Sequence, residues 1–424
     1  MDEARSVTFG RRALPVIRER MHDEPVILLE GPRSVGKSTL LRRIADASGS
    51  SVVDLDDLAT RDAVSVDPAL FMAGSAPVCV DEYQKAPIVL DAIKTELNRS
   101  SAPGRFLLAG STRHDALPIA AQSLTGRLNR ITIYPLTQGE IEGQDIRLIE
   151  GLFADPAATV PGPSSMTSRD EYIDRMVRGG FPMALARTSA HARNRWFDDY
   201  VRLTLERDAR ELSNIRRTAV LPQMLGRLAG QTGQVLNITR AASEIGMDKT
   251  TADNYTRLLE AVFLLQRLPA WNTTLTSRTA ASPKLHMMDS GVAARLMRLT
   301  PEKLTRRDPP SLTEFGHLLE TFVVDEIQRQ ASWLDGIAGV GHWRTRDGDE
   351  VDLVVERDDG AIIAFEVKAG SRIPGGDFQP MRKLRDSVGD AFIAGVALYL
   401  GKRAYTFEDR LHVMPVDRLW APAE

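Results

Sequence analysis

The sequence predicts an α/β protein with several domains, and three stretches support this. Residues 25–44 read as an apolar strand, a glycine-rich loop and an amphipathic helix. Residues 234–268 have the pattern of two short helices joined by a turn and followed by a strand. Residues 348–370 alternate apolar and charged positions around Asp359-Gly360, which predicts a β-hairpin. A chain of 424 residues has room for about two to four domains.

The composition is typical of soluble globular proteins. The net charge of −3 gives no overall attraction to nucleic acid, so any such surface must be local. Cys79 is the only cysteine, which excludes an intramolecular disulfide and a cysteine-rich zinc site. No apolar run approaches the roughly 20 residues that span a bilayer, and residues 1–12 lack the apolar core of a signal peptide. We therefore expect a cytoplasmic protein without a membrane partner.

The first predicted site is a phosphate-binding loop. The run VILLE is followed by Gly31, four further residues, and then Gly36, Lys37 and Ser38, which completes the P-loop pattern. Glycines let backbone N–H groups close around phosphates at a helix N-terminus. Lys37 is predicted to reach the β- and γ-phosphates of ATP, and Ser38 to hold Mg²⁺. The predicted ATP-binding residues of this loop are Gly31, Pro32, Arg33, Ser34, Val35, Gly36, Lys37, Ser38 and Thr39. A glycine-rich turn that arose by chance is the alternative, and the flanking strand and helix argue against it.

A second apolar run, residues 78–80, ends in two carboxylates. Asp81 is predicted to orient Mg²⁺ or its water, and Glu82 to polarise the attacking water. A third apolar run, within residues 104–114, ends at Ser111, whose hydroxyl could contact the γ-phosphate or that water. For the two acids, the alternative is a solvated strand end.

Two arginines follow the third strand. Arg127 and Arg130 lie in the stretch SLTGRLNRITIYPLT, and either could stabilise charge on the transferred phosphoryl group. Such an arginine is typically worth about 10³–10⁵ in rate. An exposed arginine without a catalytic role is the alternative.

The middle of the chain predicts helices and few chemical groups. Residues 146–215 combine a Pro- and Ser-rich stretch with an arginine-containing helix, and predict a linker and helical region. Residues 216–275 predict a winged-helix-like domain. The side chains that would face a DNA groove are Lys249, Thr250, Asn254 and Arg257. Asp248 and Asp253 on the same helix would repel phosphate, so a packing module is the alternative.

The charged side of the hairpin is the second candidate site. Val351, Leu353 and Val355 are predicted to share the apolar face of the first strand. Asp352 then lies on the other face, beside Glu366 and Lys368 of the second strand. Two carboxylates on adjacent strands can converge on one Mg²⁺, and the metal would supply Lewis acidity and a nucleophilic hydroxide. A solvated face of an amphipathic hairpin is the alternative.

The order of the motifs resembles a prokaryotic family of AAA+-like ATPases that carries a C-terminal domain of unknown function. The motifs are EGPRSVGKSTLLRR, VDEYQKAP, LLAGSTRH, SLTGRL, YPLTQGE, GGFPMAL, YVRLTLERDAREL, PKLHMMDSGVAARL, GHLLETFVVDEI, EVDLVVE and FEVKAG, and the likeness runs from about residue 8 to residue 420. The resemblance implies that Ser111 is a sensor-type residue and that Arg127 acts in trans on a neighbouring ATP site. A homo-oligomer is compatible with that role.

The hairpin and its flanking helices resemble the PD-(D/E)xK nuclease fold, which implies a nuclease-like domain at residues 276–424. In that reading Asp352, Glu366 and Lys368 form the catalytic core, and Glu320 helps from a helix. The metal ligands would be Glu320, Asp352 and Glu366, with Mg²⁺ or alternatively Mn²⁺. The usual proline before the first acid is replaced by Val351, and the fold also occurs in proteins that have lost cleavage.

Together these stretches predict an ATPase core at residues 1–145 whose Mg²⁺-dependent ATP hydrolysis governs the C-terminal domain. That domain would bind, and could cleave, DNA or RNA. The alternative is an ATP-gated regulator or scaffold whose nuclease-like domain is inactive and which binds nucleic acid or protein.

Overall fold

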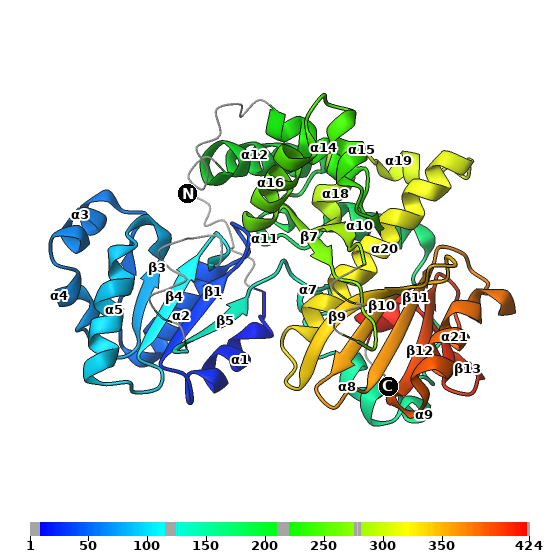
Figure 1. The fold of residues 1–424 in the computed structure, drawn as a ribbon, viewed down its shortest axis with the longest axis horizontal. Coiled ribbons are helices and arrows are strands. Elements are labelled where there is room, and N and C mark those ends of the chain that lie inside the picture. The colour runs from blue at the N-terminus through cyan, green and yellow to red at the C-terminus, as the bar shows by residue number, and fades with distance from the viewer. Residues whose placement is uncertain are drawn as a thin grey trace.

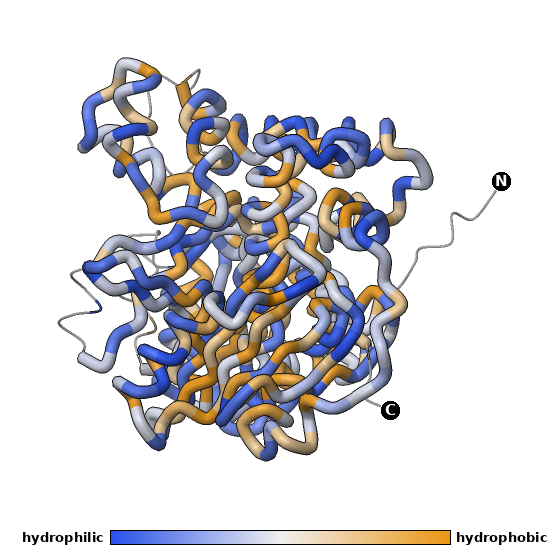
Figure 2. Tube along the Cα trace, turned by 90° about the vertical axis from the view of Figure 1, so that its right-hand side faces the viewer, coloured by the Kyte–Doolittle hydropathy of each residue, from blue (hydrophilic) through white to orange (hydrophobic). Residues whose placement is uncertain are grey.

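A computed structural model of the chain describes residues 9–114, 124, 126–209, 220–274, 278 and 281–421. An N-terminal sheet, a helical middle region and a C-terminal sheet follow one another along the chain (Figure 1). Apolar segments gather in the interior strands, and polar segments run along the outer helices and loops (Figure 2). None of the helices in the described part of the chain combines the length and the apolar character that crossing a bilayer requires.

The N-terminal unit is a five-stranded parallel sheet in the order β2-β3-β4-β1-β5. Its strands are β1 (Val26–Glu30), β2 (Val52–Asp54), β3 (Val78–Asp81), β4 (Phe106–Gly110) and β5 (Leu128–Thr132). Its helices are α1 (Ala13–Arg20), α2 (Lys37–Ser48), α3 (Leu58–Val66), α4 (Pro68–Met72) and α5 (Ile88–Arg99). Every residue of β1, β3 and β4 is buried, as their unbroken apolar runs predict for a covered parallel sheet.

The strand order decides which loops meet. β4 lies between β1 and β3, and the three strands are parallel. Their carboxyl ends therefore share one edge of the sheet, and ligands of open α/β sheets bind outside that edge. The loop after β4 lies between the P-loop, which follows β1, and the two acids that end β3.

The middle region is mostly helical. It contains α10 (Arg169–Arg178), α11 (Pro182–Leu185), α12 (Ala190–Leu203), a π-helical turn (Thr204–Asp208), α14 (Leu221–Ala229), α15 (Ile238–Ser243), α16 (Lys249–Ala261), α18 (Ser290–Leu296) and α19 (Pro301–Leu304). Between these helices lies a small antiparallel sheet in the order β6-β8-β7, with bounds Gln234–Val235, Lys284–Met287 and Leu265–Leu268. The helix-turn-helix pattern forms α15 and α16, but its sheet is completed by β8, which lies beyond residue 275.

The C-terminal unit is a six-stranded mixed sheet in the order β13-β14-β12-β11-β10-β9. Its strands are β9 (Ile337–Arg344), β10 (Glu350–Arg357), β11 (Ile362–Lys368), β12 (Phe392–Tyr399), β13 (Tyr405–Glu408) and β14 (Leu411–Pro415). The long helix α20 (Pro309–Ala331) and α8 (Leu148–Ala154) pack on one face, and α21 (Gln379–Val388) packs on the other. Two short helices, α8 and α9 (Pro156–Thr159), thus come from the stretch predicted as a linker.

The hairpin departs from the predicted faces at one residue. The register between β9 and β10 shifts between Val351 and Val354. Leu353 and Val355 enter the core on the α20 side, whereas Val351 packs in the core on the α21 side. The prediction that Val351 shares a face with Leu353 and Val355 is therefore wrong, because a β-bulge breaks the two-residue alternation.

A buried charge cluster joins the three units. Arg329 of α20 donates to the Leu136 carbonyl at 2.9 Å and to the Met288 carbonyl at 3.0 Å. The Asp289 carboxylate accepts from the backbone N–H of Gly180 at 2.8 Å and lies 3.4 Å from Arg329. Both carboxyl oxygens of Glu326 accept from the backbone N–H of Gln138, which begins α7 (Gln138–Glu142), at 3.0 and 3.1 Å.

This charge cluster predicts that the stability of the folded state depends on pH. Burial raises the pKa of Glu326 from 4.5 to about 8, although Arg329 opposes the shift. The folded state therefore keeps a proton that the unfolded state loses, and stability falls as pH rises from about 4.5 to about 8. We expect Glu326→Gln to flatten the decline of the thermal unfolding midpoint over this range, whereas exposed Glu19→Gln leaves the decline as it is. An unchanged slope in Glu326→Gln would contradict this assignment.

Candidate functional site

The P-loop is held in shape by glycine. Gly31 has φ +152°, and a Cβ there would lie 2.2 Å from the backbone oxygen of Ile133. That oxygen belongs to the residue whose N–H donates to the Glu30 carbonyl at 2.7 Å, so it cannot easily move. Gly36, with φ +100°, forms the N-cap of α2. The loop thus leads directly into the N-terminus of a twelve-residue helix, where backbone N–H groups favour an anion.

Lys37 lies inside the loop that it belongs to. Its ammonium donates to the carbonyls of Gly31 at 2.8 Å and Pro32 at 2.7 Å, and the residue is buried. Burial lowers its pKa to about 8, and nearby Glu82 partly offsets this shift. The structure therefore places a buried cation among the residues predicted to bind phosphate.

The two residues predicted to manage Mg²⁺ contact each other. Ser38, in the first turn of α2, hydrogen-bonds the carboxyl group of Asp81 at the end of β3. Burial raises the pKa of Asp81, and the hydrogen bond from Ser38 opposes the shift. A hydroxyl and a carboxylate oxygen side by side are hard ligands that fit Mg²⁺ together with phosphate oxygens and water.

Glu82 and Ser111 also lie together, as the strand order requires. The Ser111 hydroxyl donates to Glu82 Oε2 at 3.1 Å, and Gln84 Nε2 donates to the Ser111 hydroxyl at 3.1 Å. Glu82 has φ +52° and ψ +43°, a left-handed conformation that is uncommon for a non-glycine residue. Gln84, two residues after Glu82, completes this group and was not predicted from the sequence.

A second carboxylate reaches the site from the middle region. Arg33 of the P-loop donates through Nε and Nη2 to the two oxygens of Asp208, both at 2.6 Å. Arg33 also lies 3.7 Å from Glu82. Asp208 sits on the π-helical turn after α12 and is buried. The sequence does not mark this residue, because Asp208 stands in an arginine-rich helical pattern and belongs to no recognisable nucleotide-binding motif.

A cavity of about 550 Å³ opens at this edge of the sheet. The P-loop residues from Arg33 to Thr39 and Glu82 form one wall. The other residues that line the cavity include Phe9, Arg11, Leu136, Pro182 and Met183. These five residues come from the segment before α1 and from the YPLT and GGFPMAL motifs, and no role was predicted for them. Apart from Arg11, these five residues are apolar, as is usual in pockets that bind small organic molecules.

Arg127 lies at the other edge of the sheet. It directly precedes β5, whose first residue, Leu128, pairs with Val26 at the start of β1. Arg127 is therefore at the amino ends of the strands, and the P-loop is at their carboxyl ends. The five residues of β1 separate the two ends by about 13–17 Å. Arg127 donates to the side chain of Asn98 at 2.8 Å. Within one chain it therefore lies away from the P-loop, and its predicted action in trans stays a prediction.

The predicted metal centre of the C-terminal domain contains a lysine. The ammonium of Lys284 contacts Glu320 at 2.8 Å, Asp352 at 2.9 Å, and Glu350. Although burial lowers the pKa of Lys284, the carboxylates of Asp352, Glu320 and Glu350 raise it more. Asp352 Oδ2 accepts from the backbone N–H of Val367 at 2.9 Å, so both oxygens of Asp352 are bound to donors.

The remaining predicted residues of that centre pair with each other. Lys368 donates to Glu366 Oε1 at 2.9 Å. Burial and the charge of Asp352 raise the pKa of Glu366 to about 8. In the described part of the chain, no group of three or more His, Cys, Asp or Glu side chains is arranged to hold a metal ion. Because Lys284 contacts Glu320 and Asp352 in this structure, the predicted metal site at Glu320, Asp352 and Glu366 stays a prediction.

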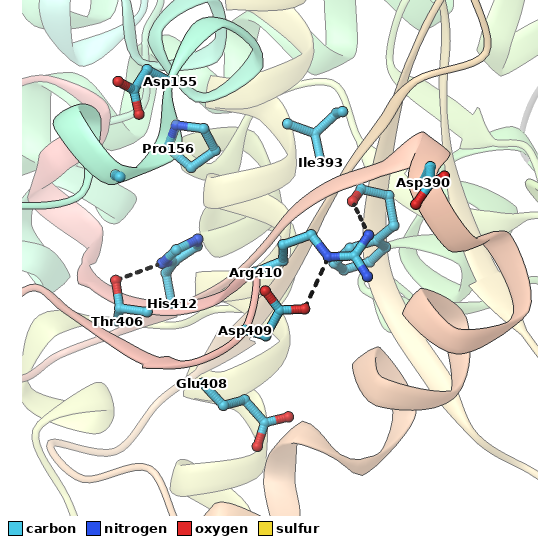
Figure 3. A pocket seen from close by; sticks show the side chains of 11 residues that line it. Asp155, Pro156, Asp390, Ile393, Thr406, Glu408, Asp409, Arg410 and His412 are labelled. Atoms are coloured by element: carbon cyan, nitrogen blue, oxygen red, sulfur yellow. Dashed lines mark hydrogen bonds and ion pairs between the residues drawn. The ribbon is translucent and has the colours of Figure 1, made fainter.

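A further hollow, of about 650 Å³, lies between α9 and the β13–β14 ribbon (Figure 3). His412 bonds to Thr406 at 3.1 Å, and Arg410 pairs with Asp409 at 3.2 Å and with two backbone carbonyls. His412 Nε2 is buried and has no hydrogen-bond partner in the described part of the chain, but these side chains do not converge on a common point as the residues of the nucleotide cavity do.

Comparisons with known proteins agree with the N-terminal site. Residues 23–142 match the family model of an AAA domain. Residues 169–303 and 315–419 match models that are each described as a domain of unknown function, DUF8612 and DUF4143. The uncharacterized protein Rv2008c of Mycobacterium tuberculosis and the uncharacterized protein Mb2031c of Mycobacterium bovis are each 27% identical over 414 residues, which cover 96% of this chain and 84% of each relative.

Solved structures show weaker likeness. The Walker-type ATPase PABY2304 of Pyrococcus abyssi shares 14% identity with a TM-score of 0.43, covering 69% of this chain and 97% of that chain. The RuvB Holliday junction branch migration motor of Thermotoga maritima shares 17% identity with a TM-score of 0.28, covering 62% and 90% of the two chains. The family model and the residues described above, and not these partial superpositions, identify the N-terminal unit as a P-loop ATPase domain of the AAA type.

A substitution tests the P-loop geometry. Gly31→Ala places a methyl group against the Ile133 carbonyl and also forces an unfavourable backbone conformation. The conformational cost alone is about 1–3 kcal/mol, and moving the loop should abolish ATP binding in calorimetry. The control is Gly226→Ala within α14, where a Cβ meets nothing within 4 Å and ATP binding should be retained. Normal ATP affinity in Gly31→Ala would contradict the predicted role of this backbone.

Proposed function

We propose that the chain hydrolyses ATP with Mg²⁺ at the carboxyl edge of the N-terminal sheet. One observation carries this proposal: Lys37, the Ser38–Asp81 pair and the Ser111–Glu82 pair all line the same edge, next to a cavity of about 550 Å³. Lys37 binds the β- and γ-phosphates, and the backbone N–H groups of the loop bind the remaining phosphate oxygens. Lys37 and the backbone N–H groups are thus in position before the reaction begins. Phosphoryl transfer is catalysed mainly by such positioning and by electrostatic stabilisation of the phosphoryl group.

Ser38 and Asp81 are the residues that would hold Mg²⁺, which when bound supplies charge neutralisation at the phosphates. Glu82 orients and polarises the attacking water, while Ser111 holds the Glu82 carboxylate through its hydroxyl. Asp208 holds Arg33 by two hydrogen bonds and so fixes the guanidinium beside Glu82. A carboxylate from the middle region thus takes part in ordering the ATP site.

The buried charge cluster supports coupling between ATP and the C-terminal domain. Leu136 lines the nucleotide cavity, and its carbonyl accepts from Arg329 of α20. Arg11 lines the same cavity and lies 3.5 Å from Glu140, which belongs to α7 beside Glu326. A shift of the cavity wall on ATP binding would therefore act on α20, the helix that covers the C-terminal sheet.

We further propose that the C-terminal domain binds nucleic acid without cleaving it. A hollow of about 430 Å³ beside the Lys284 cluster is lined by Arg344, Thr345, Arg346 and Asn272, which are suited to phosphate contacts. Lys284 occupies the predicted metal position, which favours the ATP-gated binding protein over the metal-dependent nuclease. The α16 residues Lys249, Thr250 and Asn254 are a second candidate contact, whereas Arg257 is paired with Asp253 at 2.9 Å.

Two substitutions test the ATPase. Lys37→Ala removes the buried cation and should abolish ATP binding in calorimetry. Glu82→Gln keeps the fold of the site but cannot polarise water, so ATP should bind while turnover falls by about 10²–10⁴-fold. The matched control is Glu19→Gln on α1, which should hydrolyse ATP at the unchanged rate. Unchanged hydrolysis in both site variants would refute the proposal.

The predicted action of Arg127 on a neighbouring subunit is tested by mixing two inactive variants. Arg127→Ala should leave ATP binding intact and lower turnover by about 10³–10⁵-fold, with Arg130→Ala as the neighbouring control. Lys37→Ala has a defective P-loop but an intact Arg127, so mixing it with Arg127→Ala should restore part of the activity if subunits share sites. No recovery, with a monomer in sedimentation, would rule out action in trans.

Nucleic-acid binding is tested with plasmid, linear and single-stranded DNA and with RNA, each with and without ATP. We expect binding that depends on ATP, is weakened by Arg344→Ala with Arg346→Ala, and leaves the polymer intact in Mg²⁺. Cleavage that EDTA stops and that Asp352→Ala abolishes would instead establish the nuclease.

A further inference from the structure

Lys284 is the least exposed charged residue of the acid cluster, and it comes from outside the C-terminal sheet. Its side chain is 1% exposed. It begins β8, which pairs with β6 and β7 of the middle region. The carboxylates around it come from α20 and β10 of the C-terminal unit. A buried lysine from the sheet of the middle region thus contacts acids of the C-terminal unit.

The ammonium has the contacts of a bridging cation. It lies 2.8 Å from Glu320 on the helix and 2.9 Å from Asp352 on the strand, and it also pairs with Glu350. The bulge in β10 lies at Asp352 and changes the direction of this part of the strand. The second oxygen of Asp352 is fixed by the Val367 N–H. Each oxygen of Asp352 therefore already has one donor.

One oxygen of the cluster is different. Glu366 is buried, and its Oε2 has no hydrogen-bond partner in the described part of the chain, while its Oε1 binds Lys368. The cluster contains four carboxyl groups, those of Glu320, Glu350, Asp352 and Glu366, and two ammonium groups, those of Lys284 and Lys368. Removing the ammonium would leave more negative charge and would free oxygens of Glu320 and Asp352.

We propose that Lys284 is the resident cation of this acid cluster, in the place where a divalent metal would otherwise bridge Glu320 and Asp352. The ammonium pairs the acids and ties β8 to α20 and β10. The cluster is thus a structural joint between the middle region and the C-terminal sheet, and it takes up no metal. This inference concerns the contact between the middle region and the C-terminal sheet and does not depend on ATP hydrolysis.

Manganese binding tests the inference on the full-length protein. Electron paramagnetic resonance counts the Mn²⁺ bound per chain, without nucleotide and with a non-hydrolysable ATP analogue. Wild type and Asp352→Asn should bind equal amounts in each condition, because only the P-loop site contributes. Lys284→Met keeps an apolar stem and removes the charge, so it should gain one Mn²⁺ per chain. Removing a nearby like charge should tighten Mn²⁺ binding at the cluster by on the order of 10²–10³-fold.

The controls separate the possible outcomes. Adding Asp352→Asn to Lys284→Met should abolish the gained ion, and Lys368→Met alone should gain none. Thermal unfolding of Lys284→Met should occur at a lower temperature than that of wild type and shift upward in Mn²⁺. A wild-type ion that Asp352→Asn removes would overturn the proposal even if Lys284→Met fails to fold. A folded Lys284→Met chain that gains no ion would overturn it as well.

Discussion

The parallel pairing of β1, β3 and β4 is the constraint on which the nucleotide site depends. Each strand contributes one group at its carboxyl end: the P-loop after β1, Asp81 and Glu82 after β3, and Ser111 after β4. No sequence motif brings these groups together, because some 30 to 50 residues separate them along the chain. The sheet does so since hydrogen bonding fixes the distance between neighbouring strands at about 4.8 Å.

The sheet also explains which parts of the site were predictable. Lys37, Ser38 and Asp81 follow unbroken apolar runs, which are typical of strands covered on both faces, so their positions could be inferred in advance. The positions of three other residues could not be inferred: Arg11 reaches the site from the segment before α1, and Pro182 and Asp208 reach it from the middle region. Their approach depends on tertiary packing, for which a single sequence carries no periodic signal.

The C-terminal domain shows the same limit in a sharper form. The hairpin and its turn at Asp359-Gly360 were predicted from alternation, and the strands lie at Glu350–Arg357 and Ile362–Lys368. Alternation also predicted the direction of Val351, and the bulge overturned that prediction. Lys284 was missed entirely, because it lies 68 residues before Asp352 and stands in a short strand of another unit. A D…ExK pattern shows which acids are present in the sequence. It does not show that Lys284 contacts them, and this contact affects whether they can bind a metal.

β8 connects the two charge clusters of the molecule. Lys284 begins the strand within the acid cluster, and Asp289, two residues after the strand ends at Met287, belongs to the cluster around Arg329. An extended segment of this length spans about 17 Å and is stiff, because β6 and β7 pair with it on both sides. Burying these charges carries a desolvation cost that only good partners offset, so neither end can shift freely. If Leu136 moves at the nucleotide cavity, as the proposed coupling requires, the movement would act on Arg329 and Asp289, and β8 would transmit it to Lys284. The charge pairs that hold the units together thus also connect the nucleotide cavity with the C-terminal sheet, through β8 and through α20, which carries both Arg329 and Glu320.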